Sequence, residues 1–359
     1  MGASSHDPEG AVNPGPPAGA LDTTGTRGRY ELPAFRARRW LRGGHLQTIS
    51  SFILPRRFHL PAAEERLIEV APGIKVRCWL HWQGPGAGER SEPLTLIVVH
   101  GLEGSHESQY MRGVARNGLA AGMNVVRMNQ RNCGGMNRHA ATLYNSSLSA
   151  DVAAVARHVV ENDGVSRFAL AGFSMGGNLV LKLAGEWGRR GPAAFRAVVA
   201  VCPAMDLAAS ADALHQPGNR IYEYYFLWQL FRRFREKAKF FPKEFDVARL
   251  KGVTSLRRFD DRVTAHYCGF TGADDYYARA AAANVVDKIA VPALIIHAGN
   301  DPFIRLLPQT REKILGNPNI TFVETDDGGH CAFVGERDGA GDDGRWAERE
   351  VVEFVRRHA

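Results

Sequence analysis

One short segment, residues 167–178, constrains the fold more than any other part of the chain. It reads RFALAGFSMGGN, and a helical pattern from Leu179 to Trp187 follows it. A G-x-S-x-G between a buried strand and a helix is typical of a nucleophile elbow, where side chains at Gly172 and Gly176 would collide with neighbouring backbone. Ser174 is then expected to stand exposed at the strand end, above the helix N-terminus. The alternative is an ordinary glycine-rich turn, since the chain holds 38 glycines.

Apolar runs that alternate with helical patterns continue on both sides of this segment. Such alternation predicts an α/β fold with a mostly parallel central sheet flanked by helices. The other expected strands are Glu65–Val70, Ile74–Trp82, Leu94–Val99, Met123–Met128, Phe195–Cys202, Ala290–Ala298 and Ile320–Glu324, the first two forming a hairpin about Pro72 and Gly73. The other expected helices are Ser108–Ala121, Leu148–Val160, Pro302–Leu315 and Arg345–His358.

The length of 359 residues, 45% of them hydrophobic, suits one domain with an insertion. Residues 1–29 are rich in Gly, Pro, Ala, Ser and Thr, and we expect a disordered tail there. Residues 30–359 then form a single domain, in which residues 30–60 are an N-terminal arm. The alternation breaks over residues 204–287, which predicts a helical lid inserted into the fold.

Two further residues complete a catalytic pattern with Ser174. In the α/β-hydrolase fold the serine comes first along the chain, the acid second and the histidine last. Asp301 and His330 arrive in that order, each just past the end of an expected strand, where parallel sheets place their ligands. The chemistry needs an imidazole to take the proton of the serine and a carboxylate to orient that imidazole. Asp206 is the competing acid, although a cap or turn at the start of the insertion explains it as well.

The segment His100–Gly104, HGLEG, follows an expected strand at the position where such enzymes form half of an oxyanion hole. We expect the backbone amides of Leu102 and Met175 to donate to the oxyanion. The alternative for HGLEG is a glycine-rich turn that caps the next helix. His100 is expected to orient this loop, and His100, Gly101 and Phe173 are the expected neighbours of the substrate.

Aromatic and aliphatic residues recur at helical spacing within the insertion, and basic residues fill the positions between them. The apolar set is Tyr224, Leu227, Trp228, Phe231 and Phe234. One interpretation is an apolar wall for an acyl chain, with Trp228 and Phe231 contacting the substrate and a basic rim near phosphate or membrane. The other is a helix packed over the core.

Composition argues against several other classes. The net charge is +7, but the basic residues are spread out, which argues against a nucleic-acid partner and leaves room for peripheral contact with an anionic membrane. The five cysteines are scattered, which predicts a reducing compartment, and no spacing suggests a metal site or a cofactor. The absence of an apolar run of membrane-spanning length, or of a secretion signal, predicts a cytoplasmic protein.

Together these motifs resemble the AB-hydrolase-4 family, which includes YheT-like bacterial hydrolases, EMB8-like plant proteins and ABHD1/ABHD3-type animal lipases. The resemblance runs from Tyr30 to the C-terminus. It rests on GHLQT at 44–48, HGLEG at 100–104, NQRNCGG at 129–135, GFSMGGN at 172–178, FDDRVT at 259–264, Tyr276-Tyr277, Asp301–Phe303 and Gly328–His330. It implies an α/β-hydrolase core, a triad on Ser174, Asp301 and His330, and carboxylester or lipid substrates. Animal members carry an N-terminal membrane anchor, whereas this chain has a polar tail at that place.

The expected function is hydrolysis of carboxylic esters with short- to medium-chain acyl groups, through an acyl-enzyme on Ser174. One alternative shares the acyl-enzyme but passes the acyl group to an alcohol, as the resemblance to yeast members that make ethyl esters from acyl-CoA implies. Another alternative is a binding module without catalysis, because a fold does not fix a function.

Overall fold

The computed structural model of the chain describes residues 32–84, 93–337, 339 and 342–359. The expected tail, residues 1–29, lies outside these residues. The described strands form one sheet in the order β1-β2-β4-β3-β5-β6-β7-β8. They are β1 (Glu64–Ala71), β2 (Ile74–His81), β3 (Thr95–Val99), β4 (Asn124–Met128), β5 (Phe168–Phe173), β6 (Phe195–Val201), β7 (Ala293–Ala298) and β8 (Ile320–Thr325).

The sheet is antiparallel at the edge formed by β1 and β2 and parallel from β4 to β8. β1 pairs with β2 as a hairpin, and β2 pairs antiparallel with β4. From β4 across to β8, every neighbouring pair is parallel. Each residue of β3, β4, β5 and β7 is buried, as expected for parallel strands that are covered on both faces. The carboxyl ends of β3, β5, β6, β7 and β8 therefore lie along one edge of the sheet.

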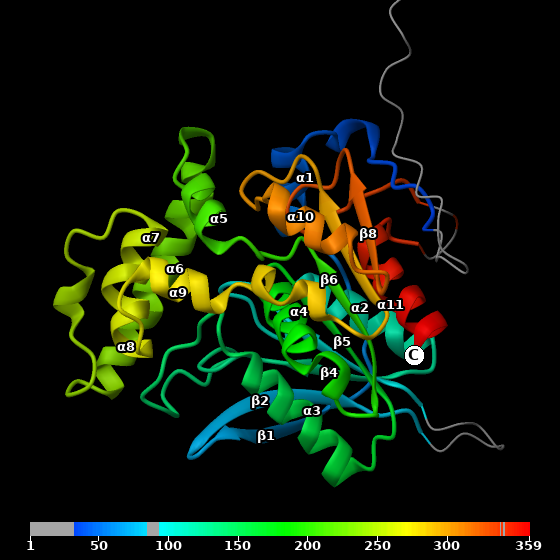
Figure 1. Cartoon of the computed structure of the whole chain (residues 1–359), viewed down its shortest axis with the longest axis horizontal. Coiled ribbons are helices and arrows are strands. Elements are labelled where there is room, and N and C mark those ends of the chain that lie inside the picture. Colours follow the sequence, from blue (N-terminus) through cyan, green and yellow to red (C-terminus); the bar gives the residue numbers. More distant parts are fainter. Residues whose placement is uncertain (1–31, 85–92, 338, 340–341) are drawn as a thin grey trace, which may run out of the picture.

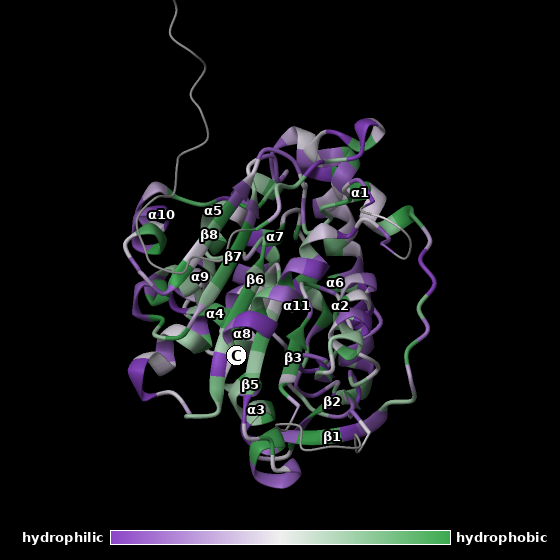
Figure 2. Cartoon of the chain, turned by 90° about the vertical axis from the view of Figure 1, so that its right-hand side faces the viewer, coloured by the Kyte–Doolittle hydropathy of each residue, from purple (hydrophilic) through white to green (hydrophobic). Residues whose placement is uncertain are grey.

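Helices cover both faces of the sheet, as Figure 1 shows. The main helices are α1 (Gly44–Ile53), α2 (Gln109–Ala120), α3 (Ser149–Asp163), α4 (Met175–Trp187), α5 (Leu207–Leu214), α6 (Arg220–Phe240), α7 (Leu256–Phe259), α8 (His266–Cys268), α9 (Ala273–Ala280), α10 (Pro308–Leu315) and α11 (Trp346–His358). One apolar cluster joins the sheet to α3, α4 and α10, and a second joins it to α2 and α11. Hydropathy colouring shows the same apolar centre, where β5, β6 and β7 are green (Figure 2).

The segment between β6 and β7 interrupts the alternation of strands and helices. It holds α5 to α9 together with the short turns η3 (Pro217–Asn219), η4 (Val247–Leu250), η5 (Asp260–Ala265), η6 (Ala282–Asn284) and η7 (Val286–Lys288). Helices α6 to α9 project to one side of the sheet in Figure 1. The remaining short turns are η1 (Arg39–Leu41), in the N-terminal arm, and η2 (Gly188–Arg190), after α4.

One element differs clearly from its expected bounds. The sequence predicted a helix over Pro302–Leu315, but α10 begins only at Pro308. The Asp301 carboxylate accepts hydrogen bonds from the amides of Phe303 and Ile304, which holds the first residues in a turn. The Arg305 guanidinium, which donates to the Asp301 and Pro302 carbonyls, fixes the same turn.

Among the described residues, no helix combines the length and the apolar character that crossing a membrane requires.

Candidate active site

The turn from β5 to α4 holds Ser174 in a strained backbone conformation. Its φ is 54° and its ψ is −119°, a region that residues with a side chain adopt rarely. An added Cβ at Gly172 would lie 2.2 Å from the Gly176 carbonyl oxygen, and one at Gly176 would lie 2.4 Å from the Val99 carbonyl oxygen. Both positions therefore exclude any side chain. The tight turn presents the Ser174 hydroxyl at the carboxyl edge of the sheet.

Ser174, His330 and Asp301 form one chain of hydrogen bonds. The Ser174 Oγ lies 2.9 Å from the His330 Nε2, and the His330 Nδ1 lies 2.8 Å from an oxygen of Asp301. Ser174 follows β5, Asp301 follows β7, and His330 lies in the loop after β8. In this arrangement the imidazole can take the hydroxyl proton, while the carboxylate fixes its tautomer and stabilises the imidazolium.

The Asp301 side chain is fully buried, yet its environment favours the charged form. Burial opposes ionisation, but the charge and hydrogen bond of His330 and the amides of Ile304 and Phe303 outweigh it, so the pKa of this carboxyl is below its ordinary value. Asp301 therefore stays a carboxylate at neutral pH.

Asp206, the competing acid, has a different set of partners. Its carboxylate accepts from the Leu307 amide, at 2.9 Å, and from the Thr310 hydroxyl, at 2.8 Å. Both partners lie at the start of α10, where helix amides lack intrahelical acceptors. Asp206 thus caps α10, although it precedes α5 in sequence, and it does not hydrogen-bond to His330.

Helix α1 of the N-terminal arm supports the loop that carries His330. The Thr48 Oγ accepts from the His330 backbone amide at 2.8 Å and donates to the Gly44 carbonyl at 2.6 Å. The Gln47 side-chain amide pairs with both the backbone N–H and the C=O of Val334. An added Cβ at Gly44 would lie 1.9 Å from the Asn300 carbonyl oxygen, so the helix lies directly against the Asp301 loop as well.

These contacts give the GHLQT segment, residues 44–48, a physical role that sequence reasoning missed. The sequence predicts an N-terminal arm over residues 30–60 and assigns it no role in the site. Its glycine and its polar residues between apolar ones were the available signal, but nothing in the sequence identifies a partner that lies 282 positions away in the chain.

Thr48→Ala is expected to lower kcat about tenfold with little change in KM, since it leaves the buried His330 amide without its acceptor, a loss of about 1–3 kcal/mol. Steady-state kinetics on a p-nitrophenyl ester, with thermal unfolding as a check on folding, measures this. Thr48→Ser keeps the hydroxyl and is expected to restore kcat. Ser51→Ala is the matched control. It removes another hydroxyl of the same helix, which donates to the backbone carbonyl of Thr48 and does not contact His330. Equal kcat in Thr48→Ala and Ser51→Ala would contradict the positioning role.

The predicted donors to an oxyanion lie beside Ser174. Met175 is the first residue of α4, where backbone amides have no intrahelical acceptor. Leu102 and Met175 both line a cavity that also contains Ser174. No acceptor for the Leu102 amide is found among the residues that the structure describes. Both amides are therefore available to a bound group.

His100 is fully buried, and its ring holds the loop after β3. Its Nδ1 lies 2.8 Å from the Gly101 carbonyl, and its Nε2 accepts from the Gln130 amide at 3.1 Å. Burial is the main reason that its pKa falls to about 4, so the ring stays neutral. Gly101 lies against the nucleophile, since an added Cβ there would come within 3.1 Å of the Ser174 Cβ.

An apolar cavity extends from Ser174 beneath the helices inserted between β6 and β7. Its wall is mainly aliphatic and aromatic, with a few polar groups. The residues that line it include Leu102, Leu143, Met175, Ala204, Leu207, Leu214, Phe226, Leu230, Phe234, Leu256, Phe259, Phe303 and Ile304. Apolar walls with a few placed polar groups are typical of sites for small organic ligands.

The predicted substrate neighbours His100, Gly101, Phe173, Trp228 and Phe231 are not among the residues that line this cavity. Helix α6 does contribute to the wall, but through Phe226, Leu230, Arg233 and Phe234. Trp228 is 59% exposed and does not line the cavity. The helical spacing of the apolar residues predicted helix α6 correctly, but the face of α6 that lines the cavity is determined by tertiary packing.

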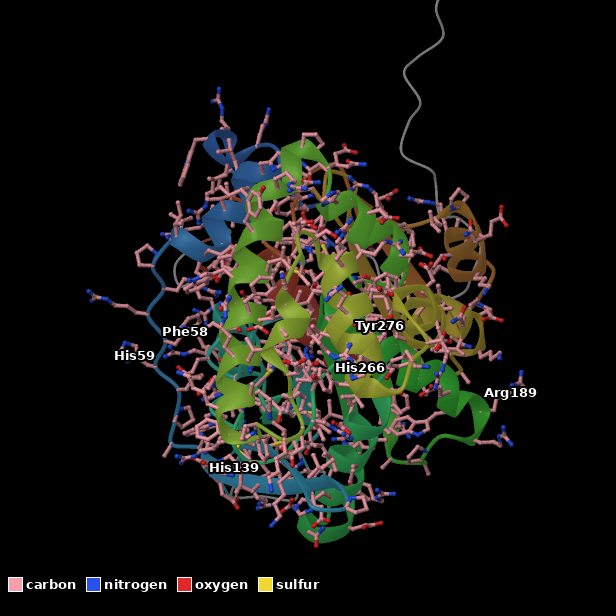
Figure 3. The ribbon with its side chains drawn as sticks, turned by 90° about the vertical axis from the view of Figure 1, so that its left-hand side faces the viewer. Phe58, His59, His139, Arg189, His266 and Tyr276 are labelled. Carbon is pink, nitrogen blue, oxygen red and sulfur yellow. The ribbon has the colours of Figure 1, made fainter. Side chains whose placement is uncertain are left out.

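Asp260, which sequence reasoning noted only within the FDDRVT segment and without a role, lies in the cavity wall. Its carboxylate accepts from the Tyr277 and Thr264 hydroxyls, both at 2.7 Å. Burial raises the pKa of this carboxyl from 3.8 to about 6, although those hydrogen bonds and the charge of Arg257 oppose the rise. Tyr276, which precedes Tyr277 on α9 and also lines the cavity, is labelled in Figure 3.

This pKa predicts a pH-dependent loss of stability. The pKa of Asp260 in the folded protein lies above its unfolded value, so the protonated carboxyl favours the folded state. This contribution is fully present below pH 4 and is lost as the pH rises through 6, which lowers the free energy of unfolding by about 3 kcal/mol. Asp260→Asn cannot ionise, so its free energy of unfolding relative to wild type should rise between pH 4.5 and 7.5. Urea unfolding at both pH values measures this, with Asp287→Asn, an exposed acid, as control. A difference that does not change with pH would exclude the effect.

The structure also brings together two cysteines and His330. Cys202, His330 and Cys331 place their potential ligand atoms within 4.8 Å of one another, a group that sequence spacing did not reveal. The His330 Nε2 already faces Ser174. Burial, with the neighbouring Cys202, raises the pKa of the Cys331 thiol well above its ordinary value. A neutral thiol is a poor nucleophile, so Cys331 does not compete with Ser174 for that role.

The sheet order, the elbow and the ordered serine, acid and histidine define the α/β-hydrolase class. Residues 95–336 match the family model described as alpha/beta hydrolase fold. YheT of Escherichia coli (strain K12), whose name assigns it esterase activity provisionally, is 32% identical over 295 residues, covering 81% of this chain and 84% of YheT. The chain therefore belongs to the α/β-hydrolase family, and the resemblance to YheT-like proteins is confirmed.

Other relatives place the chain among ABHD-type members of that family. The phospholipase ABHD3 of Bos taurus is 28% identical over 241 residues, which are 67% of this chain and 58% of ABHD3. The Pyrobaculum calidifontis esterase has a similar fold, with a TM-score of 0.55 at 19% identity, covering 88% of this chain and 91% of that chain. The Pyrococcus furiosus esterase Pf2001 gives a TM-score of 0.54 at 16% identity, covering 91% of this chain and 99% of that chain.

Proposed function

We propose that the protein is a serine hydrolase that cleaves carboxylic esters through an acyl-enzyme on Ser174. The observation that carries the proposal is the hydrogen-bonded chain of Ser174, His330 and Asp301 at the wall of an apolar cavity. Esterase and phospholipase names among the relatives agree with this chemistry.

The reaction follows from the geometry. His330 takes the Ser174 proton as the oxygen attacks the ester carbonyl, and Asp301 stabilises the resulting imidazolium. The Leu102 and Met175 amides donate to the oxygen that becomes negative in the tetrahedral intermediate. His330 then protonates the leaving alcohol. In the second half of the reaction it activates a water molecule, which releases the acid and restores Ser174.

The cavity fits the acyl part of the substrate. Its wall is mainly apolar, and Leu214, Phe226 and Leu230 belong to it together with Ser174. Burial of each CH₂ group contributes about 0.8 kcal/mol, so affinity should grow with chain length until the cavity is full. This supports short- to medium-chain acyl groups as substrates. A series of p-nitrophenyl esters of increasing acyl length tests the assignment.

Leu230→Trp is expected to shift the preferred acyl length downward, because the indole fills space at the buried position 230. The value of kcat/KM for an octanoyl ester should fall at least about tenfold while that for an acetyl ester changes little, in line with the 10–200-fold range for one methylene in an apolar pocket. Tyr224→Trp, on the exposed side of the same helix, is the matched control. An unchanged length profile would place the acyl chain elsewhere.

Acyl transfer to an alcohol shares the acyl-enzyme and differs only in the acceptor. One relative, from Saccharomyces cerevisiae, is named medium-chain fatty acid ethyl ester synthase/esterase 2 and is 25% identical over 292 residues, which are 72% of this chain and 61% of that protein. Incubation with an acyl-CoA and ethanol, followed by product analysis, distinguishes the two reactions. If the amount of ethyl ester formed is well above the amount of free acid, acyl transfer rather than hydrolysis is the function.

A further inference from the structure

A second cavity lies away from the candidate active site and is lined mainly by arginine. It has a volume of about 290 Å³ and shares no lining residue with the apolar cavity. The residues around it come from the N-terminal arm, from α2 and from the segment that leads into α11. They are Arg38, Leu54, Pro55, Arg56, Arg57, Arg116, Val334, Arg337, Asp343 and Arg345. We call it the arginine cavity.

The arginine cavity carries a large excess of positive charge. Among its described lining residues, six are arginines and one, Asp343, is acidic. Arg56 pairs with Asp343 at 2.7 Å and with the buried Glu348 at 2.6 Å, and Arg116 pairs with Asp343 at 3.0 Å. Asp343 and Glu348 therefore form ion pairs with two of the six guanidinium groups, and they act on Arg345 only through their charge.

Arg345 is the group that most requires a partner. It is only 6% exposed and lines the arginine cavity, yet within the described part of the chain its guanidinium forms no hydrogen bond or ion pair. Burial and the positive charges of Arg56 and Arg38 lower the pKa of Arg345 to about 10, although the charges of Glu348 and Asp343 oppose the fall, so it remains charged at neutral pH. A buried charge without a hydrogen-bonding partner is costly, and a bound anion would reduce that cost.

The other arginines are placed to receive the same anion. Arg38 is held by its bonds to the carbonyls of Gly335 and Asp343. Arg57 and Arg337 are exposed, and among the described residues neither forms an ion pair with a carboxylate. Guanidinium groups bind phosphate oxygens in a two-point geometry, and several converging on one space favour a group with charge on several oxygens.

We propose that the arginine cavity is a binding site for a phosphate group. Two sources can present this chemistry: a soluble phosphate compound and the head group of an anionic phospholipid. The second source is favoured by the neighbouring end of α1, where Phe52 and Ile53 are 59% and 69% exposed directly before the cavity residue Leu54. An apolar edge beside a basic site is typical of proteins that contact anionic membranes.

The test uses the full chain and two probes. Calorimetric titration with inorganic phosphate, at fixed ionic strength in a chloride buffer, measures the soluble source. Flotation with vesicles of phosphatidylcholine containing phosphatidic acid, compared with phosphatidylcholine alone, measures the lipid source. The main variant is Arg57→Ser with Arg337→Ser, because both residues are exposed and their replacement should leave folding intact. Arg345→Met is the second variant and removes the buried charge.

The matched control is Arg189→Ser with Arg190→Ser, which removes the same net charge at another exposed site. Arg189 lies at the opposite edge from Phe58, whose ring contacts Arg56, in Figure 3. We expect saturable phosphate binding by wild type and by the control pair, a dissociation constant at least tenfold higher in the main variant, and no measurable binding by Arg345→Met.

Vesicle binding that falls in the same variants assigns the source to a phospholipid, whereas phosphate binding without vesicle binding assigns it to a soluble compound. The absence of saturable binding to either probe would overturn the proposal. Equal weakening in the main variant and in the control pair would overturn it too, because the effect would then be one of net charge. Neither result bears on ester hydrolysis, which uses a separate cavity.

Discussion

Ser174→Ala is expected to abolish ester hydrolysis, with kcat lower by roughly 10⁴- to 10⁶-fold, the range found when a triad nucleophile is removed. The oxygen that lies 2.9 Å from the His330 Nε2 is the only atom of this side chain that can form the acyl-enzyme. KM should change little, because the cavity proposed to hold the acyl group is intact. Hydrolysis of a p-nitrophenyl butyrate under saturating conditions gives both constants.

Ser210→Ala is the matched control for this change. Ser210 is also a buried serine that lines the apolar cavity, but its hydroxyl accepts from the Arg305 amide and does not face His330. The control should keep kcat within a few-fold of wild type. Residual activity in Ser174→Ala within tenfold of wild type, with heating profiles unchanged, would show that another group attacks the ester.

Asp301→Asn is expected to lower kcat by about 10⁴-fold, because an amide in place of the carboxylate favours the wrong tautomer of the histidine and cannot stabilise its charged form. The fully buried carboxylate lies 2.8 Å from the His330 Nδ1, so no water can replace it without rearrangement. The effect should appear in kcat rather than in KM, and steady-state kinetics measures both.

Asp206→Asn separates the two candidate acids. Asp206 bonds to Leu307 and Thr310 at the start of α10, so its replacement is expected to lower the melting temperature and to leave kcat within a few-fold of wild type. If instead Asp206→Asn lost activity by orders of magnitude and Asp301→Asn did not, the assignment of the acid would be reversed.

The sheet and its triad loops were predictable because their signals are local. A run such as Leu94–Val99 is apolar at every position except Thr95, which distinguishes a strand covered on both faces, and β3 (Thr95–Val99) lies within it. Asp301 and His330 follow such runs directly, and parallel strands bring their carboxyl ends to one edge. The strand order itself then places these loops beside Ser174.

The parts that sequence did not predict depend on contacts between distant segments. Thr48 supports His330 across most of the chain length, and no local pattern encodes that pairing. The inward face of α6 carries Phe226 and Leu230, while the predicted Trp228 is exposed, because α6 is oriented by its packing against α5, α7, η3 and η4. The delayed start of α10 likewise follows from the turn that Asp301 forms with Phe303 and Ile304.

Covalent labelling with a fluorophosphonate tests the central claim most directly, because the probe reacts with a serine only when a base activates its hydroxyl. We predict that intact-mass spectrometry will show one adduct on the wild-type chain, that peptide mapping will locate it on Ser174, and that Ser174→Ala will remain unlabelled while Ser210→Ala labels like wild type. No adduct on folded wild-type protein, or equal labelling of Ser174→Ala, would contradict the assignment of Ser174 as an activated nucleophile.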